Sequence, residues 1–305
     1  MRNIKIWDVR GTDYTEWVTR PATLEALPVS RVELAWLGQA GFVIKAPGVS
    51  LSIDMYLSDS LAKKYAGKEF PHIRMAPAPV LPEALKSMDL ILSTHGHTDH
   101  MDGEALEVIY KDGGAVSPVF IGPRAEMQKA GERGVPSGKF IGLTSDESYT
   151  LYKGQQGRWL KKLAAVTAIP AAHEVLDADG WGNYRALGYV IDIHGLRMYH
   201  SGDTVPYEGL SEHLRNLRID VALLPVNGRD EYRTSRGIAG NFTLEEACSC
   251  CRDAGIPFLI PHHYGMFEFN TIDPREVDRG LESWGWQVGK DSLKTEMGFV
   301  YTIGV

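Results

Sequence analysis

The chain has 305 residues, of which 44% are hydrophobic, and this is enough apolar material for a large core. Its net charge of −7 argues against a nucleic-acid-binding protein, which usually presents a basic face. No apolar run reaches the roughly 18 residues of a membrane span, so we expect no membrane partner. Because the N-terminus lacks the apolar core of a secretory signal, we expect a cytoplasmic protein.

Residues 1–30 have no clear periodicity and carry Trp7 and Trp17. They predict an N-terminal extension that packs on the outside of a single domain spanning residues 31–305. Residues 32–37 and 41–45 are apolar runs that a short turn separates, and residues 49–54 follow as a third strand. Asp54 ends this third strand, where it would either approach a site or shape the loop.

Residues 55–88 form a long segment with little pattern. Long loops of this kind often cover functional sites. Arg74 lies in this segment and is therefore a candidate for binding an anionic group of a substrate, although an ordinary surface arginine is an equal alternative.

Residues 90–102 combine a buried strand with a cluster of polar side chains. Residues 90–92 predict a short buried strand and residues 103–110 predict a helix, so the cluster lies where the carboxyl end of a strand meets a helix. Ligand sites of α/β proteins collect at such ends. The cluster supplies side chains of the types that bind zinc and similar divalent ions, namely His95, His97, Asp99 and His100. Because these exceed what one tetrahedral ion needs from a single loop, we expect two metal ions to share it.

The rest of the chain predicts two similar halves in which helices flank strands. Further strands are predicted over residues 118–123, 140–143, 160–170, 185–193, 196–200, 219–225 and 258–260. Helices are predicted over residues 124–131, ended by Gly131, and after the capping box of Thr243 and Glu246, ended by Gly255. Cys248 and Cys251 share one face of the second helix and are interpreted as small core residues. This arrangement favours an α/β fold with four layers, αββα.

The His-x-His-x-Asp-His pattern after a strand resembles the signature of the metallo-β-lactamase superfamily. Residues 198–204 resemble its strand that ends in a metal-bridging aspartate, and residues 260–264 resemble the strand end with its last histidine. Within the superfamily, the chain is similar to the L-ascorbate-6-phosphate lactonase group in five segments, which are residues 36–39, 52–54, 74–77, 220–223 and 261–263. The resemblance implies the four-layer sandwich, with the metals at one edge between the sheets.

The resemblance also implies a set of metal ligands. One ion would be held by His95, His97 and His173, the other by Asp99, His100 and His263, with Asp203 bridging them. The family's Pro-x-His pattern selects His263 as the ligand and leaves its neighbour His262 as a supporting or pocket residue. His72, His194, His200 and His213 lack this context and are predicted to be structural or exposed. Nitrogen-rich ligation suits zinc and carboxylates also admit manganese, so the identity of the metal stays open.

These features predict a metal-dependent hydrolase, in which two cations share one hydroxide and lower its pKa. Asp99 and Asp203 are the predicted catalytic residues. We expect a lactonase that opens a sugar-acid lactone, such as L-ascorbate 6-phosphate, and a homo-oligomer. The alternatives are a metal-dependent phosphodiesterase and a catalytically silent metal-binding protein. A serine nucleophile is not expected, because the chain has no Gly-x-Ser-x-Gly motif.

An anionic substrate needs a cationic anchor, and arginine offers a planar fork that matches phosphate or carboxylate. Residues 226–237 follow a buried strand and include Arg229, Arg233 and Arg236. The alternative is a solvated loop in which neighbouring acidic side chains pair with these arginines. The candidate substrate contacts are Arg74, Arg229, Arg236, Asn241, His262 and Tyr264.

Overall fold

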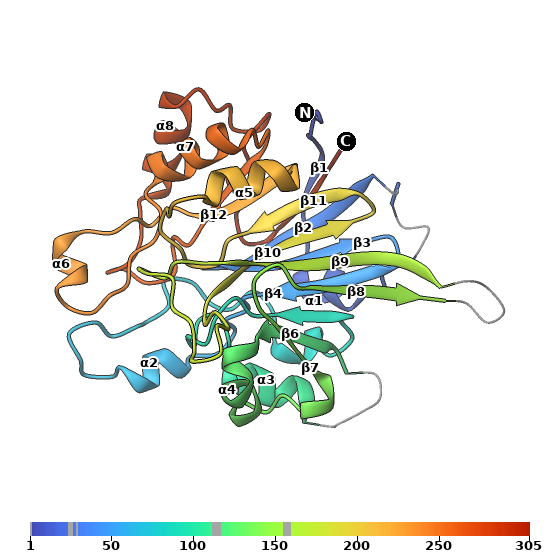
Figure 1. Cartoon of the computed structure of the whole chain (residues 1–305), viewed down its shortest axis with the longest axis horizontal. Coiled ribbons are helices and arrows are strands. Elements are labelled where there is room, and N and C mark those ends of the chain that lie inside the picture. Colours follow the sequence, from blue (N-terminus) through green and yellow to red (C-terminus); the bar gives the residue numbers. More distant parts are fainter. Residues whose placement is uncertain (1, 24–26, 29, 112–116, 155–159) are drawn as a thin grey trace.

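The computed structural model describes residues 2–23, 27–28, 30–111, 117–154 and 160–305. Within this part of the chain the strands form two sheets that pack face to face, with helices on both outer sides (Figure 1). This is the predicted four-layer αββα architecture. None of the helices found there combines the length and the apolar character that a membrane crossing needs.

The first sheet has eight strands in the order β1-β14-β2-β3-β4-β5-β6-β7 among the described residues. Pairing is antiparallel from β1 through to β4 and parallel from β4 to β7. The strands are β1 (Lys5–Gly11), β2 (Arg31–Gly38), β3 (Gly41–Ala46), β4 (Val49–Ile53), β5 (Leu90–Leu92), β6 (Val119–Pro123), β7 (Phe140–Leu143) and β14 (Phe299–Gly304).

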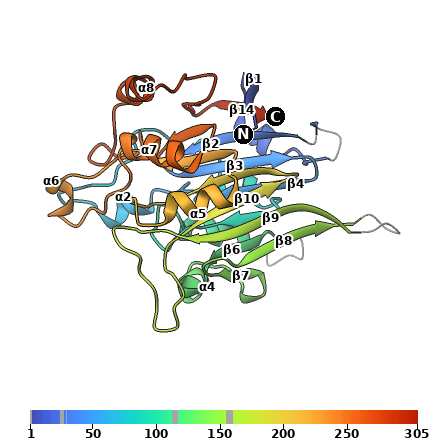
Figure 2. The ribbon, with the colours of Figure 1, turned by 45° about the horizontal axis from the view of Figure 1, so that its top comes forward.

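The second sheet has six strands in the order β13-β12-β11-β10-β9-β8 over the same described ranges. Pairing is antiparallel from β8 to β11 and parallel from β11 to β13. The strands are β8 (Ser148–Lys153), β9 (Lys161–Pro170), β10 (Leu187–Ile193), β11 (Leu196–His200), β12 (Val221–Pro225) and β13 (Leu259–His262). The segment that joins β9 to β10 extends away from the sheets (Figure 2).

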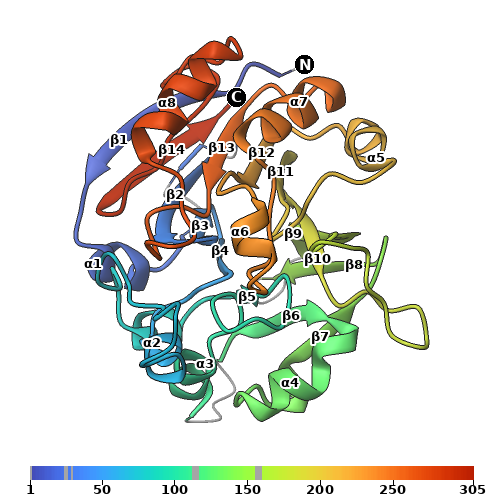
Figure 3. The same cartoon turned by 90° about the vertical axis from the view of Figure 1, so that its left-hand side faces the viewer.

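The helices divide between the two outer faces (Figure 3). Helices α1 (Tyr14–Thr19), α3 (Gly103–Tyr110) and α4 (Met127–Glu132) pack on the first sheet, whereas α5 (Leu210–Leu217), α7 (Leu244–Ala254) and α8 (Pro274–Ser283) lie on the side of the second. Two short helices, α2 (Ser60–Lys64) and α6 (Glu231–Thr234), lie in the segments around the site.

Strand β2 contributes alternate side chains to the two apolar layers on either face of the first sheet. Leu34 and Trp36 point into the core between the sheets, and Ala35 and Leu37 point into the layer under α1 and α3. This follows the period-2 alternation of a strand. Because both faces are covered by protein, the strand reads as a continuous apolar run rather than an alternating one.

The N-terminal segment is part of the first sheet and of its covering layer. Strand β1 pairs with β14 at the edge of the sheet, and Trp17 of α1 is 2% exposed. The Trp17 indole donates a hydrogen bond of 2.8 Å to Glu33 in β2. Residues 5–19 therefore add an edge strand and a covering helix to the domain.

Two predicted helix ends have different outcomes. The capping box of Thr243 and Glu246 is present at the start of α7, and Gly255 ends that helix with a φ of 69°. The helix predicted over residues 124–131 is instead a 3-10 turn followed by α4, which ends at Glu132. The left-handed glycine lies at Gly134, with a φ of 90°, so Gly131 stays within the helix.

Candidate metal centre

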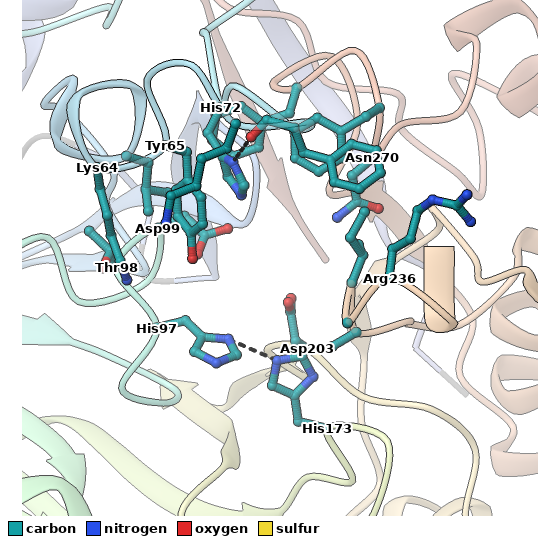
Figure 4. Close-up of a pocket in the computed structure, with 18 of the residues that line it drawn as sticks. Lys64, Tyr65, His72, His97, Thr98, Asp99, His173, Asp203, Arg236 and Asn270 are labelled. Carbon is teal, nitrogen blue, oxygen red and sulfur yellow. Dashed lines mark hydrogen bonds between the residues drawn. The ribbon is translucent and has the colours of Figure 1, made fainter. Parts of the chain in front are cut away.

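The predicted ligands meet at one edge of the molecule because four strands end there. The loop with His95, His97, Asp99 and His100 follows β5, and His173 follows β9. Asp203 follows β11 and His263 follows β13. Figure 4 shows His97, His173, Asp99 and Asp203 facing one cavity.

The side chains lie at distances suited to shared ligation. His173 Nε2 and His97 Nδ1 are 3.0 Å apart. Asp203 Oδ2 lies 3.3 Å from His100 Nε2 and 3.2 Å from His263 Nε2. The groups His95–His97–His173, His95–His100–Asp203 and Asp99–His100–His263 each bring their ligand atoms within 4.8 Å of one another. The second of these groups shares His95 with the first and His100 with the third, so it links the other two.

Several of these atoms are buried and have no hydrogen-bond partner within the described residues. They are His95 Nε2, His100 Nε2, His173 Nδ1, both ring nitrogens of His263 and Asp203 Oδ1. Buried polar atoms without partners are costly. A divalent cation would satisfy them, since imidazole nitrogens and carboxylate oxygens are its usual ligands. The donor set therefore fits a metal and makes the cluster capable of binding one.

Burial favours the neutral, metal-binding form of two of these histidines, His95 and His173. Burial lowers the pKa of His95 well below its usual range and lowers the pKa of His173 to about 4. Both imidazoles are therefore neutral at pH 7, which is the form that binds metals. Burial alone would raise the pKa of Asp203, but His100 and His263 outweigh it and hold the pKa well below the usual value.

His100 carries the opposite shift. Burial acts to lower the pKa of His100, but the carboxylates of Asp203, Asp54 and Asp99 raise it well above its usual value. Three carboxylates around one buried imidazole leave an excess of negative charge. A cation at this position would neutralise that charge in place of a proton.

Asp54 is hydrogen-bonded to the loop of residues 94–100, which carries four of the predicted ligands and which we call the metal loop. It is buried at the end of β4 with a φ of 48°. One of its oxygens accepts from the Thr94 backbone amide at 2.7 Å, and the other accepts from Thr94 Oγ1 at 2.7 Å and from His100 Nδ1 at 2.8 Å. With Nδ1 occupied, Nε2 of His100 is left to face Asp203. Of the two roles open for Asp54 in the sequence, the structure supports the approach to the site.

We predict that Asp54→Asn weakens metal binding by roughly 10- to 100-fold, the usual range when a partner of a ligating histidine is lost. The amide offers one acceptor oxygen, and its NH2 group would face groups that already donate. Calorimetric titration of the metal-free protein with zinc or manganese measures the change.

The control is Asp89→Asn, because Asp89 also ties β4 to the start of β5, through the Ser50 amide, and it pairs with Lys153 of β8, away from the cluster. Equal losses of metal affinity in the two variants would mean that Asp54 acts only on folding.

The cavity in front of the cluster has a volume of about 550 Å³. Its metal side is formed by His97, Asp99, His173, Asp203 and His263. The opposite side is aromatic and comes from Tyr65, Phe70, His72, Phe267 and Phe269. The cationic side chains around it are Lys64, Lys68, Lys129, Arg133 and Arg236. Figure 4 shows Lys64 and Arg236 on opposite sides of the cavity.

Of the predicted substrate contacts, Arg236 lines this cavity, and the other five lie elsewhere among the described residues. The Arg236 guanidinium pairs with Glu69 at 2.9 Å and lies over the Tyr232 ring. Arg229 faces Glu246 at 2.6 Å and lines a different cavity. Asn241 is buried and donates to Asn227. The partners of Arg229 and Asn241 in the fold keep both away from a ligand in the metal cavity.

The other three candidates are held by the protein itself. Arg74 donates to the backbone carbonyls of Tyr56 and Ala76. Tyr264 donates to the Thr295 carbonyl and is 3% exposed. His262 is fully buried and stacks on His200, with ring centroids 4.8 Å apart. His262 therefore supports the core between the sheets rather than the cavity.

Sequence reasoning missed the aromatic side and the three lysines of the cavity, Lys64, Lys68 and Lys129. His72, predicted to be structural or exposed, lines the cavity. The available signal was the unusual length of residues 55–88, which indicated a covering loop. Without periodicity, nothing in that segment selected particular side chains.

Comparisons with known proteins agree with this geometry. A family model described as "Beta-lactamase superfamily domain" matches residues 58–264. A UPF0173 metal-dependent hydrolase of Myxococcus xanthus is 31% identical over 78% of this chain and 72% of its own length. A probable L-ascorbate-6-phosphate lactonase UlaG of Salmonella paratyphi B is 25% identical over 96% of this chain and 85% of its own. The structure of Igni18, a metallo hydrolase of Ignicoccus hospitalis, shares the fold with a TM-score of 0.60, 22% identity and coverage of 90% and 98%.

Proposed function

The chain belongs to the metallo-β-lactamase superfamily, and on this basis we propose that it is a metal-dependent hydrolase that opens an anionic lactone. The hydrolytic site is supported by the buried nitrogen and oxygen atoms that converge at the strand ends and have no hydrogen-bond partner in the described part of the chain. The lactone is supported by the similarity to a probable L-ascorbate-6-phosphate lactonase over nearly the whole chain.

We assign the metal side of the cavity to two divalent ions, zinc or manganese. His95, His97 and His173 would hold one ion, Asp99, His100 and His263 the other, and Asp203 would contact both. Bound ions of this kind supply Lewis acidity and make water a nucleophile at neutral pH.

Residues of the chain itself orient the carboxylates of the site and can accept a hydrogen bond from water or substrate. Gln39 Nε2 donates to Asp99 Oδ2 at 3.0 Å, which fixes the carboxylate at the cavity wall. His100 outweighs the effect of burial and lowers the pKa of Asp99, so this carboxylate is ionised and can accept a hydrogen bond from water or substrate. Asp203, also ionised, keeps His100 and His263 in place.

The test is hydrolysis of a panel with zinc or manganese restored to the purified protein. The panel contains L-ascorbate 6-phosphate, a neutral γ-lactone and bis-p-nitrophenyl phosphate. We expect ring opening of the anionic lactone with a kcat/KM of roughly 10⁴ M⁻¹s⁻¹ or more, within the usual range for enzymes. Turnover of the phosphodiester alone would assign the phosphodiesterase alternative, and turnover of none would remove the proposal.

A further inference from the structure

The side of the cavity opposite the metal cluster is a continuous aromatic wall, which we define as Tyr65, Phe70, His72, Phe267 and Phe269. Tyr65 and His72 stack with ring centroids 4.1 Å apart. The Phe269 ring lies 4.7 Å from His72 and 5.0 Å from Phe70. Phe267 and Phe269 lie nearly parallel, at 12°, with centroids 5.9 Å apart. The rings therefore form one packed surface rather than separate side chains.

This aromatic wall is uncharged and largely apolar where it meets the cavity. Burial lowers the pKa of His72, so its ring is neutral at pH 7, and its Nδ1 is occupied by the Phe70 carbonyl at 2.8 Å. Phe267 is 2% exposed, which fixes the base of the wall. Pockets lined by aromatic side chains with a few polar groups are typical of small-molecule sites.

The cationic side chains around the cavity differ in their ion-pair and hydrogen-bond partners. Lys129 pairs with Glu126 at 2.5 Å, and Arg236 pairs with Glu69. Arg133 donates to the carbonyls of His97 and Met101. Lys64 and Lys68, in contrast, form no ion pair with a carboxylate over the described parts of the chain, and the Nζ atom of each lies 5.2 Å from the centre of the Tyr65 ring.

We infer that the substrate is an ester or lactone that carries a flat apolar group, which packs on the aromatic wall, and an anionic group, which pairs with Lys64 and Lys68. This rests on the proposed hydrolytic function and narrows its substrate class. An apolar planar group gains contact with the rings. The anion gains two cations whose charge the protein leaves uncompensated. Residues 226–237, the arginine loop with Arg229, Arg233 and Arg236, then contribute structure rather than the contact to the anion.

Four lactones test the contact with the aromatic wall and the contact with the two lysines separately. They are 3-isochromanone and δ-valerolactone, each with and without a carboxylate substituent on the ring system, and all four release an alcohol on ring opening. Wild-type protein should prefer the carboxylated aromatic lactone, with kcat/KM at least about 10-fold above its aliphatic counterpart, the order expected for one aromatic contact. The preference for the carboxylate should shrink as salt rises, because exposed charges are screened.

Two variants assign these preferences to residues. Phe269→Leu should reduce kcat/KM for both aromatic lactones by roughly 5- to 10-fold and leave the aliphatic pair unchanged. The double variant Lys64→Gln with Lys68→Gln should raise KM for the carboxylated pair by roughly 5- to 10-fold and leave the neutral pair unchanged. Lys63→Gln is the matched control for charge, since Lys63 lies next to Lys64 but pairs with Glu104. Phe299→Leu, at an exposed ring of β14, is the control for the aromatic change.

Failure of the inference can be told apart from failure of the lactonase function. Calorimetry with the ring-opened acids, 2-(hydroxymethyl)phenylacetate and 5-hydroxypentanoate, needs no turnover. We expect the aromatic acid to bind roughly 10-fold more tightly and Phe269→Leu to abolish that difference. Equal binding of the two acids would overturn the aromatic part. A carboxylate preference that survives in the lysine double variant would overturn the assignment of the anion site.

Discussion

Asp203→Asn is expected to abolish hydrolysis by this protein, with kcat/KM falling by roughly 10³-fold or more. The estimate takes several kcal/mol of transition-state stabilisation from the metal centre, at about 1.36 kcal/mol per tenfold in rate. Asp203 contacts both His100 and His263 through one oxygen, and its second oxygen is buried and has no hydrogen-bond partner among the described residues. The amide removes the negative charge that a bridging ligand supplies.

Metal content after dialysis, measured together with activity, tests this role. The Asp203→Asn protein should retain less metal than wild type, and its secondary structure by circular dichroism should be unchanged. Asp253→Asn, an exposed aspartate on α7, is the control for a general loss of one charge. If Asp203→Asn keeps activity within about tenfold of that control, Asp203 does not act as a ligand.

The metal loop could be predicted because its residues are consecutive. His95, His97, Asp99 and His100 follow one buried strand, so short-range sequence carries both the ligand types and their position. Residues 198–204 and 260–264 were placed by resemblance to a family rather than by periodicity. The structure places Asp203 and His263 within reach of this loop.

Which of the adjacent histidines faces the cluster depends on a backbone change at the end of β13. His262 is the last residue of the strand, is fully buried and packs against Phe42 of β3 and His200 of β11. His263 adopts a φ of 66°, and its amide donates to the Gln39 carbonyl at 2.9 Å. This left-handed turn directs His263 to the cavity. Strand alternation indicates opposite faces but does not say which face is the site.

The roles of Arg229 and Arg236 and the aromatic wall could not be assigned from sequence, because their partners are distant along the chain. Arg233 instead pairs with the neighbouring Asp230 at 2.5 Å, as the alternative of a solvated charged loop predicted. Arg229 pairs with Glu246, which was predicted only to cap α7. Glu246 has both roles, because its carboxylate also accepts a hydrogen bond from the Thr243 backbone amide. The aromatic wall is assembled from residues 65–72 and 267–269, which neither periodicity nor spacing links. Contacts of this kind arise from tertiary packing, which overrides local pattern.

Gly202→Ala is expected to destabilise the fold and the site together. Gly202 is buried beside Asp203 with a φ of 62°. An added Cβ would lie 2.6 Å from both Cβ and Oγ1 of Thr94, so Thr94 must move. Left-handed strain and overpacking together cost roughly 2–5 kcal/mol of the free energy of unfolding. Moving Thr94 also breaks its bonds to Asp54, which positions His100.

Gly209→Ala measures the conformational part of this cost, so the difference between the two variants gives the steric part. Gly209 has a φ of 87°, and none of the described residues comes within 4 Å of an added Cβ, so Gly209→Ala carries the conformational strain alone, about 1–2 kcal/mol. Chemical denaturation of both variants gives the two free energies, and zinc titration gives the effect on the site. We expect Gly202→Ala to lose more stability than Gly209→Ala and to lose metal affinity as well. If the two variants unfold at the same denaturant concentration and bind zinc equally, the contact between Gly202 and Thr94 does not hold the loop in place.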